Sequence, residues 1–162
     1  YKHYKNKTIP IKIIFVPYIK KTLMKKVFSP TPLSFDSLLL VMRLTFGFSM
    51  LLGHGLGKFN KLFQDPIKFY NFAELGPEVS LYLAVFAELV CSVLLILGLG
   101  TRLAALPLFI TMAVAFFIFH GADPFGEREL AFCYMIIYAV FIYSGAGKYS
   151  ADSFIHSYLH KS

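Results

Sequence analysis

The sequence predicts an all-α protein, a four-helix bundle that spans a membrane, and three observations lead to this fold class. Of its 162 residues, 57% are hydrophobic and only 15% are charged, whereas ordinary soluble domains carry about 25% charged residues. Four apolar runs follow one another, at about residues 36–57, 79–99, 103–119 and 129–143. Short turns containing glycine separate the later runs, as in bundles of antiparallel neighbouring helices. We therefore expect a single membrane domain over residues 31–162.

A basic N-terminal tail, residues 1–30, precedes that domain, and we do not expect it to be part of the helical bundle. It contains eight Lys and no acidic residue, whereas the rest of the chain holds eight basic and nine acidic residues. The net charge of +7 therefore comes from the tail and gives no indication of nucleic-acid binding. Residues 1–23 lack a Met, and Met24 followed by two Lys looks like an ordinary start, so we expect residues 1–23 to lie outside the native protein. The alternative is a basic arm lying on anionic lipid.

The first apolar run predicts a helix that Ser34 or Asp36 can cap at its N-terminus. Its length of roughly 20 residues matches the hydrocarbon core of a bilayer, which is about 30 Å thick. Gly53 and Gly57 lie four residues apart, the spacing at which small side chains let two membrane helices approach closely. We expect this glycine pair to mark a contact between helices.

The long polar connection of residues 58–78 separates the first two runs. Phe and Tyr alternate with charged residues in it, which predicts a partly amphipathic segment at the membrane interface. The second run ends at Gly98-Leu99-Gly100 and the third follows almost at once, so these two helices should pack antiparallel. Residues 148–162, after the fourth run, are polar with a few apolar side chains.

Two single charges, Arg43 in the first run and Glu88 in the second, are the main candidates for a polar site. An ionised side chain at the centre of a membrane helix costs roughly 2.5–3.5 kcal/mol on insertion scales. Counted from the helix ends at Gly57 and Glu78, which share one membrane face, the charges lie about 21 and 15 Å deep. This predicts that they meet as an ion pair, which either pins the helices together or forms a polar site for a ligand or a proton.

His54 and His120 end the first and third runs and are expected on the same membrane face. They are either satisfied interfacial groups or donors and acceptors of protons, and haem ligation is a third alternative. Asp123, Glu127 and Glu129 follow shortly after His120 and could join this cluster, although a short acidic turn is usually only solvated.

Other kinds of site find less support in the sequence, and no metal site is predicted. Cys91 and Cys133 lie inside apolar runs and form no C-x-x-C pair, which argues against a thiol–disulfide enzyme. Four helices without an inverted repeat argue against a transporter. The many Phe and Tyr residues fit core packing or lipid contact, and a flat cleft for an aromatic ring would use the same residues.

Several short motifs follow one another along residues 36–154. They are Arg43-Leu-Thr-Phe-Gly47 and Gly55-Leu-Gly-Lys58, then Glu88 and Leu97-Gly-Leu-Gly-Thr-Arg102, and finally His120 and Gly145-Ala-Gly-Lys-Tyr-Ser150. In their order and spacing, these motifs resemble those of DoxX-type membrane proteins. The resemblance implies a four-helix membrane protein that acts as a component of a quinone-linked oxidoreductase, such as a quinol oxidase or a thiosulfate:quinone oxidoreductase.

The resemblance also suggests residue roles, which we state as expectations. Arg43, Glu88, His120 and His54 would transfer protons or contact a quinone headgroup, and Lys58 would join Arg43, Glu88 and His120 in binding it. No intrinsic cofactor is evident, so quinone or quinol would be the ligand and electrons would come from a soluble or membrane redox partner. Whether the chain is itself an enzyme, and whether it forms a homo-oligomer, stays open.

The location expected from the sequence is the cytoplasmic membrane of a bacterium. Outside the disputed residues 1–23, five Lys and Arg lie on the side of the termini and four on the other side, which favours cytoplasmic termini under the positive-inside rule. The alternative function is a non-catalytic scaffold or assembly subunit in which an Arg43–Glu88 pair is purely structural.

Overall fold

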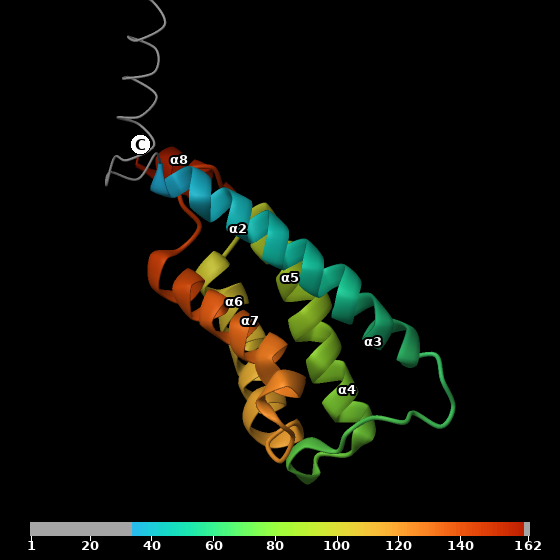
Figure 1. Cartoon of the computed structure of the whole chain (residues 1–162). Coiled ribbons are helices and arrows are strands. Elements are labelled where there is room, and N and C mark those ends of the chain that lie inside the picture. The colour runs from blue at the N-terminus through green and yellow to red at the C-terminus, as the bar shows by residue number, and fades with distance from the viewer. Residues whose placement is uncertain (1–33, 161–162) are drawn as a thin grey trace, which may run out of the picture. The chain divides into compact units, whose positions relative to one another are not determined.

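The computed structural model describes residues 34–160, and these form helices without any strand. The expectations for the basic tail, residues 1–30, lie outside the described residues. Four long helical stretches run up and down in succession, and a short helix follows them (Figure 1). Their elements are α2 (Phe35–Met50), η1 (Leu51–Gly55) and α3 (Leu56–Lys61); α4 (Pro77–Val85), η3 (Phe86–Val90) and α5 (Cys91–Leu97); α6 (Thr101–Val114) and η4 (Ala115–Phe119); α7 (Phe125–Ser144); and α8 (Ala151–Leu159). The all-α prediction is therefore confirmed for the described residues.

Three of the helical stretches are long and apolar enough to cross a membrane. They are Phe35–Lys61, Pro77–Leu97 and Thr101–Phe119, which match the first three predicted spans. The fourth predicted span corresponds to α7, which has 20 residues but begins with charged side chains such as Glu127 and Arg128. The apolar helices indicate a lipid bilayer as the environment of this protein.

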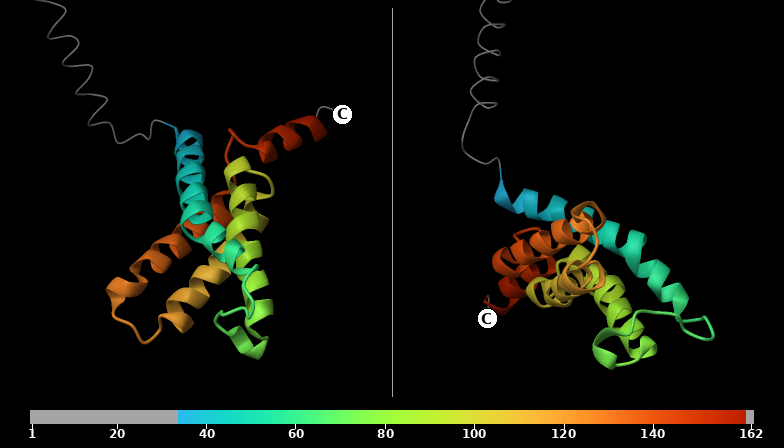
Figure 2. Two further views of the ribbon diagram at one scale, coloured as in Figure 1. Left: turned by 90° about the vertical axis from the view of Figure 1, so that its right-hand side faces the viewer. Right: turned by 60° about the horizontal axis from the view of Figure 1, so that its bottom comes forward.

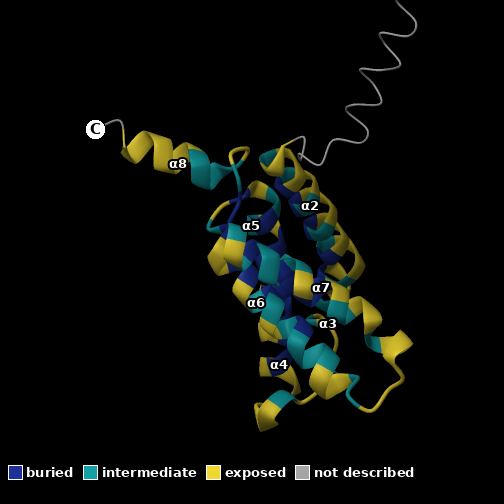
Figure 3. Cartoon of the chain, turned by 60° about the vertical axis from the view of Figure 1, so that its left-hand side comes forward, coloured by how far each residue is buried: buried dark blue, intermediate teal, exposed yellow. Residues whose placement is uncertain are grey.

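The helices pack as neighbours along the chain, with α6 against α7 and α2 against α5. The core between them is built from Leu, Met, Ala and aromatic side chains, including Leu95, Leu108, Tyr138 and Phe141, which are fully buried. Figure 3 shows this buried core between the helices and the exposed outer faces. Most of the exposed surface of the long helices is apolar, as expected of side chains that face lipid.

Glycines bring the first two long helices together, but not the pair that the sequence suggested. A Cβ atom at Gly47 would lie 2.5 Å from Ile96 Cγ1, and one at Gly55 would lie 2.6 Å from the carbonyl oxygen of Glu88. Gly53 and Gly57 have open space where a Cβ would stand. The prediction that Gly53 and Gly57 mark the contact is therefore wrong, because they lie on a different face of the helix from Gly55.

The ends of the helices show why the chain turns where it does. Ser34 Oγ accepts a hydrogen bond from the Ser37 amide at 3.3 Å and so caps α2, as predicted. Asp36 instead accepts from the Lys148 amide at 2.9 Å, and this bond ties the start of the first helix to the chain after α7. Gly98 ends α5 with φ of +68°, a conformation that favours glycine.

The connection between the first two long helices is irregular. Residues 62–76 contain one short 3₁₀ turn, η2 (Phe72–Glu74), and the partly amphipathic segment at the membrane interface stays a prediction. The polar C-terminal segment, in contrast, contains the helix α8, which the sequence analysis did not predict. Figure 2 shows α8 running sideways from one end of the bundle.

Candidate functional site

A cavity of about 890 Å³ opens at the end of the bundle opposite α8, near the 62–76 connection and the turn after η4. We call this end the cavity end. Its size falls within the roughly 300–1,000 Å³ of small-molecule sites in proteins. Much of its wall is apolar, with Ile67, Phe69, Met112, Phe119 and Leu130 among the lining residues. The polar side chains that line it include His54, Lys58, Lys61, His120, Glu127 and Tyr134.

Lys58 and Glu88 form the ion pair at this cavity. Lys58 Nζ lies 2.5 Å from Glu88 Oε2, and their side chains are 24% and 1% exposed. Glu88 Oε1 is also buried but has no hydrogen-bond partner among the described residues. Lys58 lines the cavity whereas Glu88 does not, so the buried carboxylate acts on the cavity through the lysine. An ammonium group has three N–H donors, and two remain once Glu88 is bound.

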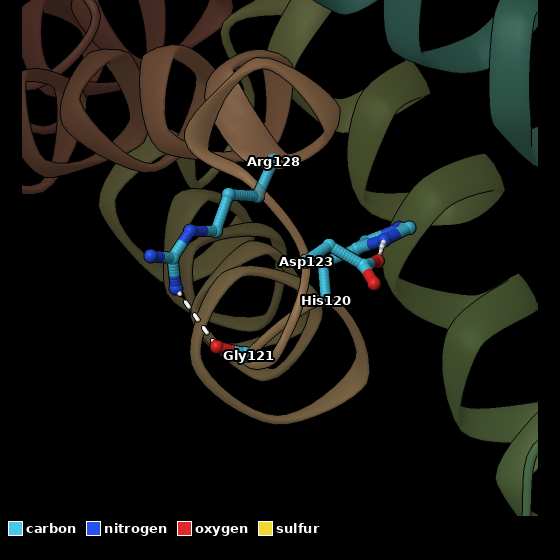
Figure 4. A network of polar contacts seen from close by, with 4 residues as sticks. All are labelled: His120, Gly121, Asp123 and Arg128. Atoms are coloured by element: carbon cyan, nitrogen blue, oxygen red, sulfur yellow. Dashed lines mark hydrogen bonds and ion pairs between the residues drawn. The ribbon is translucent and has the colours of Figure 1, made fainter.

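His120 is held by the turn that follows the third long helix. Its Nδ1 lies 2.7 Å from Asp123 Oδ2, and Figure 4 shows the two side chains facing each other. The turn itself is fixed by Arg128, whose Nη1 donates to the Gly121 carbonyl at 3.2 Å. A carboxylate at Nδ1 sets the tautomer of a neutral imidazole. The arrangement therefore leaves Nε2 of His120 as the nitrogen that can exchange a proton.

His54 and Tyr134 complete the polar wall, and Tyr138 lies behind Tyr134 in the core. The ring of His54 packs edge-on against Tyr134, with ring centroids 6.0 Å apart. Tyr134 shares a hydrogen bond of 2.5 Å with Ser49 Oγ and stacks on Tyr138 with centroids 5.8 Å apart. The Tyr138 hydroxyl is buried without a partner in the described residues. A polar strip thus runs from the cavity into the core of the bundle.

Each of the three long apolar helices changes to a π-helical segment near the cavity. These five-residue segments are η1, η3 and η4, and they contain His54, Glu88 and Phe119, with Lys58 and His120 close behind. Single π-helical turns are rare and occur frequently at functional sites. η1 and η3 also contact each other, and together the three segments support the cavity end as the place of function.

Arg43 lies elsewhere, and the predicted Arg43–Glu88 ion pair is wrong. The guanidinium is 1% exposed and donates to carbonyl oxygens at the end of α5, Leu95 at 3.4 Å and Ile96 at 3.3 Å. It also donates to the Tyr149 carbonyl before α8. Carbonyls at a helix C-terminus carry partial negative charge, so they help to compensate the buried cation, and the Asp152 carboxylate adds a further attraction. We call this end of the bundle the clamp end.

The reason for the error is the relative height of the two helices. The sequence analysis placed the ends of the first two spans level with each other, but the first helix continues to Lys61. The tight contact at Gly55 puts Glu88 level with that residue. Arg43 precedes Gly55 by twelve residues, which is about 18 Å along a helix axis. No side chain reaches across that separation.

Comparison with known proteins decides the family. Residues 38–121 match the family model described as DoxX. The chain belongs to the DoxX family. It is also similar to an uncharacterized protein of Haemophilus influenzae, with 36% identity over 111 residues that cover 64% of this chain and 81% of the relative. A second uncharacterized protein of the same species is 30% identical over 90 residues, covering 53% of this chain and 60% of its own length. No solved structure matches the chain.

The DoxX match spans the residues that the sequence analysis singled out. His54, Lys58, Glu88 and His120 all fall within residues 38–121, and the structure brings these four to one cavity or directly behind it. Arg43 also falls within the match but belongs to the clamp end. Tyr134 on α7 also lines the cavity. From the sequence it could not be singled out among the other Phe and Tyr residues, because an aromatic residue in an apolar run gives no signal that separates a cavity wall from packing.

Proposed function

We propose that this DoxX family membrane protein binds a quinone or quinol in the cavity and acts as a component of a quinone-linked oxidoreductase. One observation carries the proposal: Lys58, with buried Glu88 behind it, and His120 meet at a cavity with largely apolar walls. A quinone headgroup is a flat apolar ring with two carbonyl oxygens. Such a ring needs apolar walls and a small number of well-placed donors.

The described residues fit such a ligand in three respects. Lys58 has N–H donors left over for a carbonyl oxygen, and Glu88 keeps the ammonium at the wall of the cavity. His120, held by Asp123, can give or take a proton at Nε2. The aromatic side chains of Phe69, Phe119 and Tyr134 line the same space and can contact the ring.

The chemistry that a quinone supplies is the uptake of two electrons and two protons. The chain's own residues are proposed to bind the headgroup and to move protons, with Lys58 and His120 at the ligand and Glu88 as the buried carboxylate that holds Lys58. The electrons would come from a separate redox partner. Arg43 has no place in this proposal, since its guanidinium is bound to backbone carbonyls at the clamp end.

The proposed setting is the cytoplasmic membrane of a bacterium, with α7 as a fourth span and both ends of the chain in the cytoplasm. The up-and-down course of four helical stretches supports this arrangement. This arrangement would place the cavity toward the external face of the cytoplasmic membrane, on the side away from Phe35 and Ser144.

Binding of a short-tailed quinone to the full-length protein in lipid nanodiscs, measured by calorimetry, tests the proposal. Lys58→Gln removes a charge-assisted hydrogen bond worth about 1.5–3 kcal/mol, so the Kd should rise about tenfold or more. Lys148→Gln removes the same charge at the clamp end and should leave the Kd unchanged.

Because Lys58→Gln leaves Glu88 buried without its cation, a Lys58→Gln/Glu88→Gln double variant separates folding from binding. It should fold like the parent and still bind weakly. If the folded parent protein binds neither quinone nor quinol, the proposal fails, and the scaffold alternative would then be preferred.

A further inference from the structure

We propose that α8 lies in the plane of the membrane interface and seats its apolar face in a bilayer surface that carries anionic headgroups. The helix has one apolar face, formed by side chains that recur at helical spacing. These are Phe154, Ile155, Tyr158 and Leu159, with exposures of 75%, 44%, 71% and 66%. The face is therefore well formed and uncovered by any described part of the chain, as Figure 3 shows.

The first turn of α8 is bonded to the bundle, and this fixes where the helix leaves it. Asp152 accepts hydrogen bonds from the amides of Gly100 at 2.7 Å and Thr101 at 3.0 Å. Its own amide donates to the Gly98 carbonyl at 2.9 Å. Ser150 caps the helix by accepting from the Ser153 amide at 3.1 Å. The first turn is therefore held on the protein, whereas residues 154–160 are exposed.

The position of α8 matches the boundary between hydrocarbon and water. It follows the end of α7 and lies next to the turn between α5 and α6, where helices that cross the membrane reach its surface. It also runs across the bundle rather than along it (Figure 2, left). Amphipathic helices that lie in the interface place aromatic and aliphatic side chains at this depth, and exposed Tyr149 and Tyr158 fit the aromatic belt found there.

The charges at this end favour anionic headgroups. Arg102 and Lys148 are exposed beside α8, whereas the nearby acids are already bound inside the protein. Asp36 accepts from the Lys148 amide, and Asp152 accepts from the start of α6. Basic side chains next to an amphipathic helix attract acidic phospholipids.

A second copy of the chain is a less suitable occupant of this face. A stable protein–protein interface buries about 800 Å² on each partner. Four side chains of a nine-residue helix, each already partly covered, offer less than that. A bilayer surface needs no minimum area and continues the lipid contact of the long helices.

The chain contains no Trp, so a single Trp reports the depth of α8 without background. Phe154→Trp places the probe on the apolar face, and Ser157→Trp places a matched probe on the polar face. Both positions are exposed, so the fold should tolerate either change. The full-length variants are reconstituted in vesicles of phosphatidylcholine and phosphatidylglycerol. Quenching is measured with lipids brominated in the upper acyl chain and with aqueous iodide.

We expect bromolipid to quench Phe154→Trp at least twofold more than Ser157→Trp, and iodide to show the reverse order. Equal quenching of both probes by iodide, without bromolipid quenching, would mean that α8 stands in water and would overturn the proposal. Shielding of Phe154→Trp from both quenchers would point to a second copy and overturn it as well. Bromolipid quenching should weaken in vesicles of phosphatidylcholine alone, and an unchanged value there would overturn the choice of an anionic surface. None of these outcomes depends on quinone binding, so this proposal and the proposed function can fail separately.

Discussion

The two ends of the bundle each bury one charge, and they compensate it in different ways. At the clamp end, Arg43 is bound to three backbone carbonyls on two segments of the chain. At the cavity end, Glu88 has a single partner among residues 34–160, Lys58, whose side chain is 24% exposed and lines the cavity. Backbone carbonyls cannot move without the helix, whereas a lysine at a cavity wall can exchange one partner for another. The comparison therefore supports a structural role for Arg43, and it fits the ligand-binding role proposed for the Lys58–Glu88 pair.

The largest expected effect comes from removing the clamp. Arg43→Leu deletes all of its hydrogen bonds and leaves Asp152 without the cation that balances it electrostatically. Breaking a buried charged network costs about 3–5 kcal/mol, and we expect that loss in the free energy of unfolding, measured by titration with SDS in mixed micelles. Glu88→Gln should cost only about 1 kcal/mol, because Lys58 can turn to solvent. Equal losses for the two variants would contradict the comparison.

A second effect tests how the cavity end is positioned. Gly55→Ala places a Cβ against the backbone of Glu88, so the two helices must separate, and we expect a loss of about 2–3 kcal/mol in the same titration. Gly53→Ala is a matched control, because its Cβ would meet open space. That change should stabilise the helix by up to about 1 kcal/mol. A neutral Gly55→Ala would show that the helices do not approach as closely as described.

A smaller effect is expected for the attachment of α8 at the clamp end. Asp152→Ala removes both acceptors for the amides of Gly100 and Thr101 at the start of α6. Loss of a helix N-terminal cap costs about 0.5–2 kcal/mol, which should lower the thermal unfolding midpoint in detergent. Ser157→Ala, on the same helix but bonded only to the Ser153 carbonyl, should leave the midpoint unchanged.

The smallest effect on stability is expected at the cavity end, from Asp123→Asn. The Asp123–His120 contact is largely exposed, and such pairs contribute about 0–1 kcal/mol. The midpoint should therefore stay within the scatter of the parent. If quinone binds as proposed, its Kd should rise about fivefold, equivalent to about 1 kcal/mol, because His120 loses the group that fixes its tautomer. A large loss of stability with unchanged binding would assign this contact to the fold.

Much of the fold could be predicted from composition and hydropathy alone. The three spanning helices, the cap at Ser34 and the antiparallel turn near Gly98 all follow from patterns within a few residues of each other. The helix α8 could not be recognised, because five apolar residues among nine give only a short pattern, and its attachment through Asp152 depends on α6, which lies far away in the sequence.

The sequence was enough to name residues of the candidate site, but not to say which of them form an ion pair. His54, Lys58, Glu88 and His120 could be named because polar side chains stand out in apolar runs. The partner of Glu88 could not be chosen, since Arg43 and Lys58 lie on the same helix and only the relative height of two helices decides between them. That height is set by the close approach at Gly55, and a single sequence contains no measure of it.

The π-helical segments determine how the fold would respond to the insertion or deletion of a residue. Each contains one residue more than a regular turn, and one residue corresponds to a rotation of about 100° around the helix axis. In the first two crossings, where η1 and η3 lie between two α-helical parts, the half at the clamp end and the half at the cavity end therefore follow separate helical wheels. An insertion or deletion of one residue inside η1 or η3 would turn the cavity walls while leaving the clamp end in register. A change of length in these two segments would thus reshape the cavity while the rest of the scaffold stays the same.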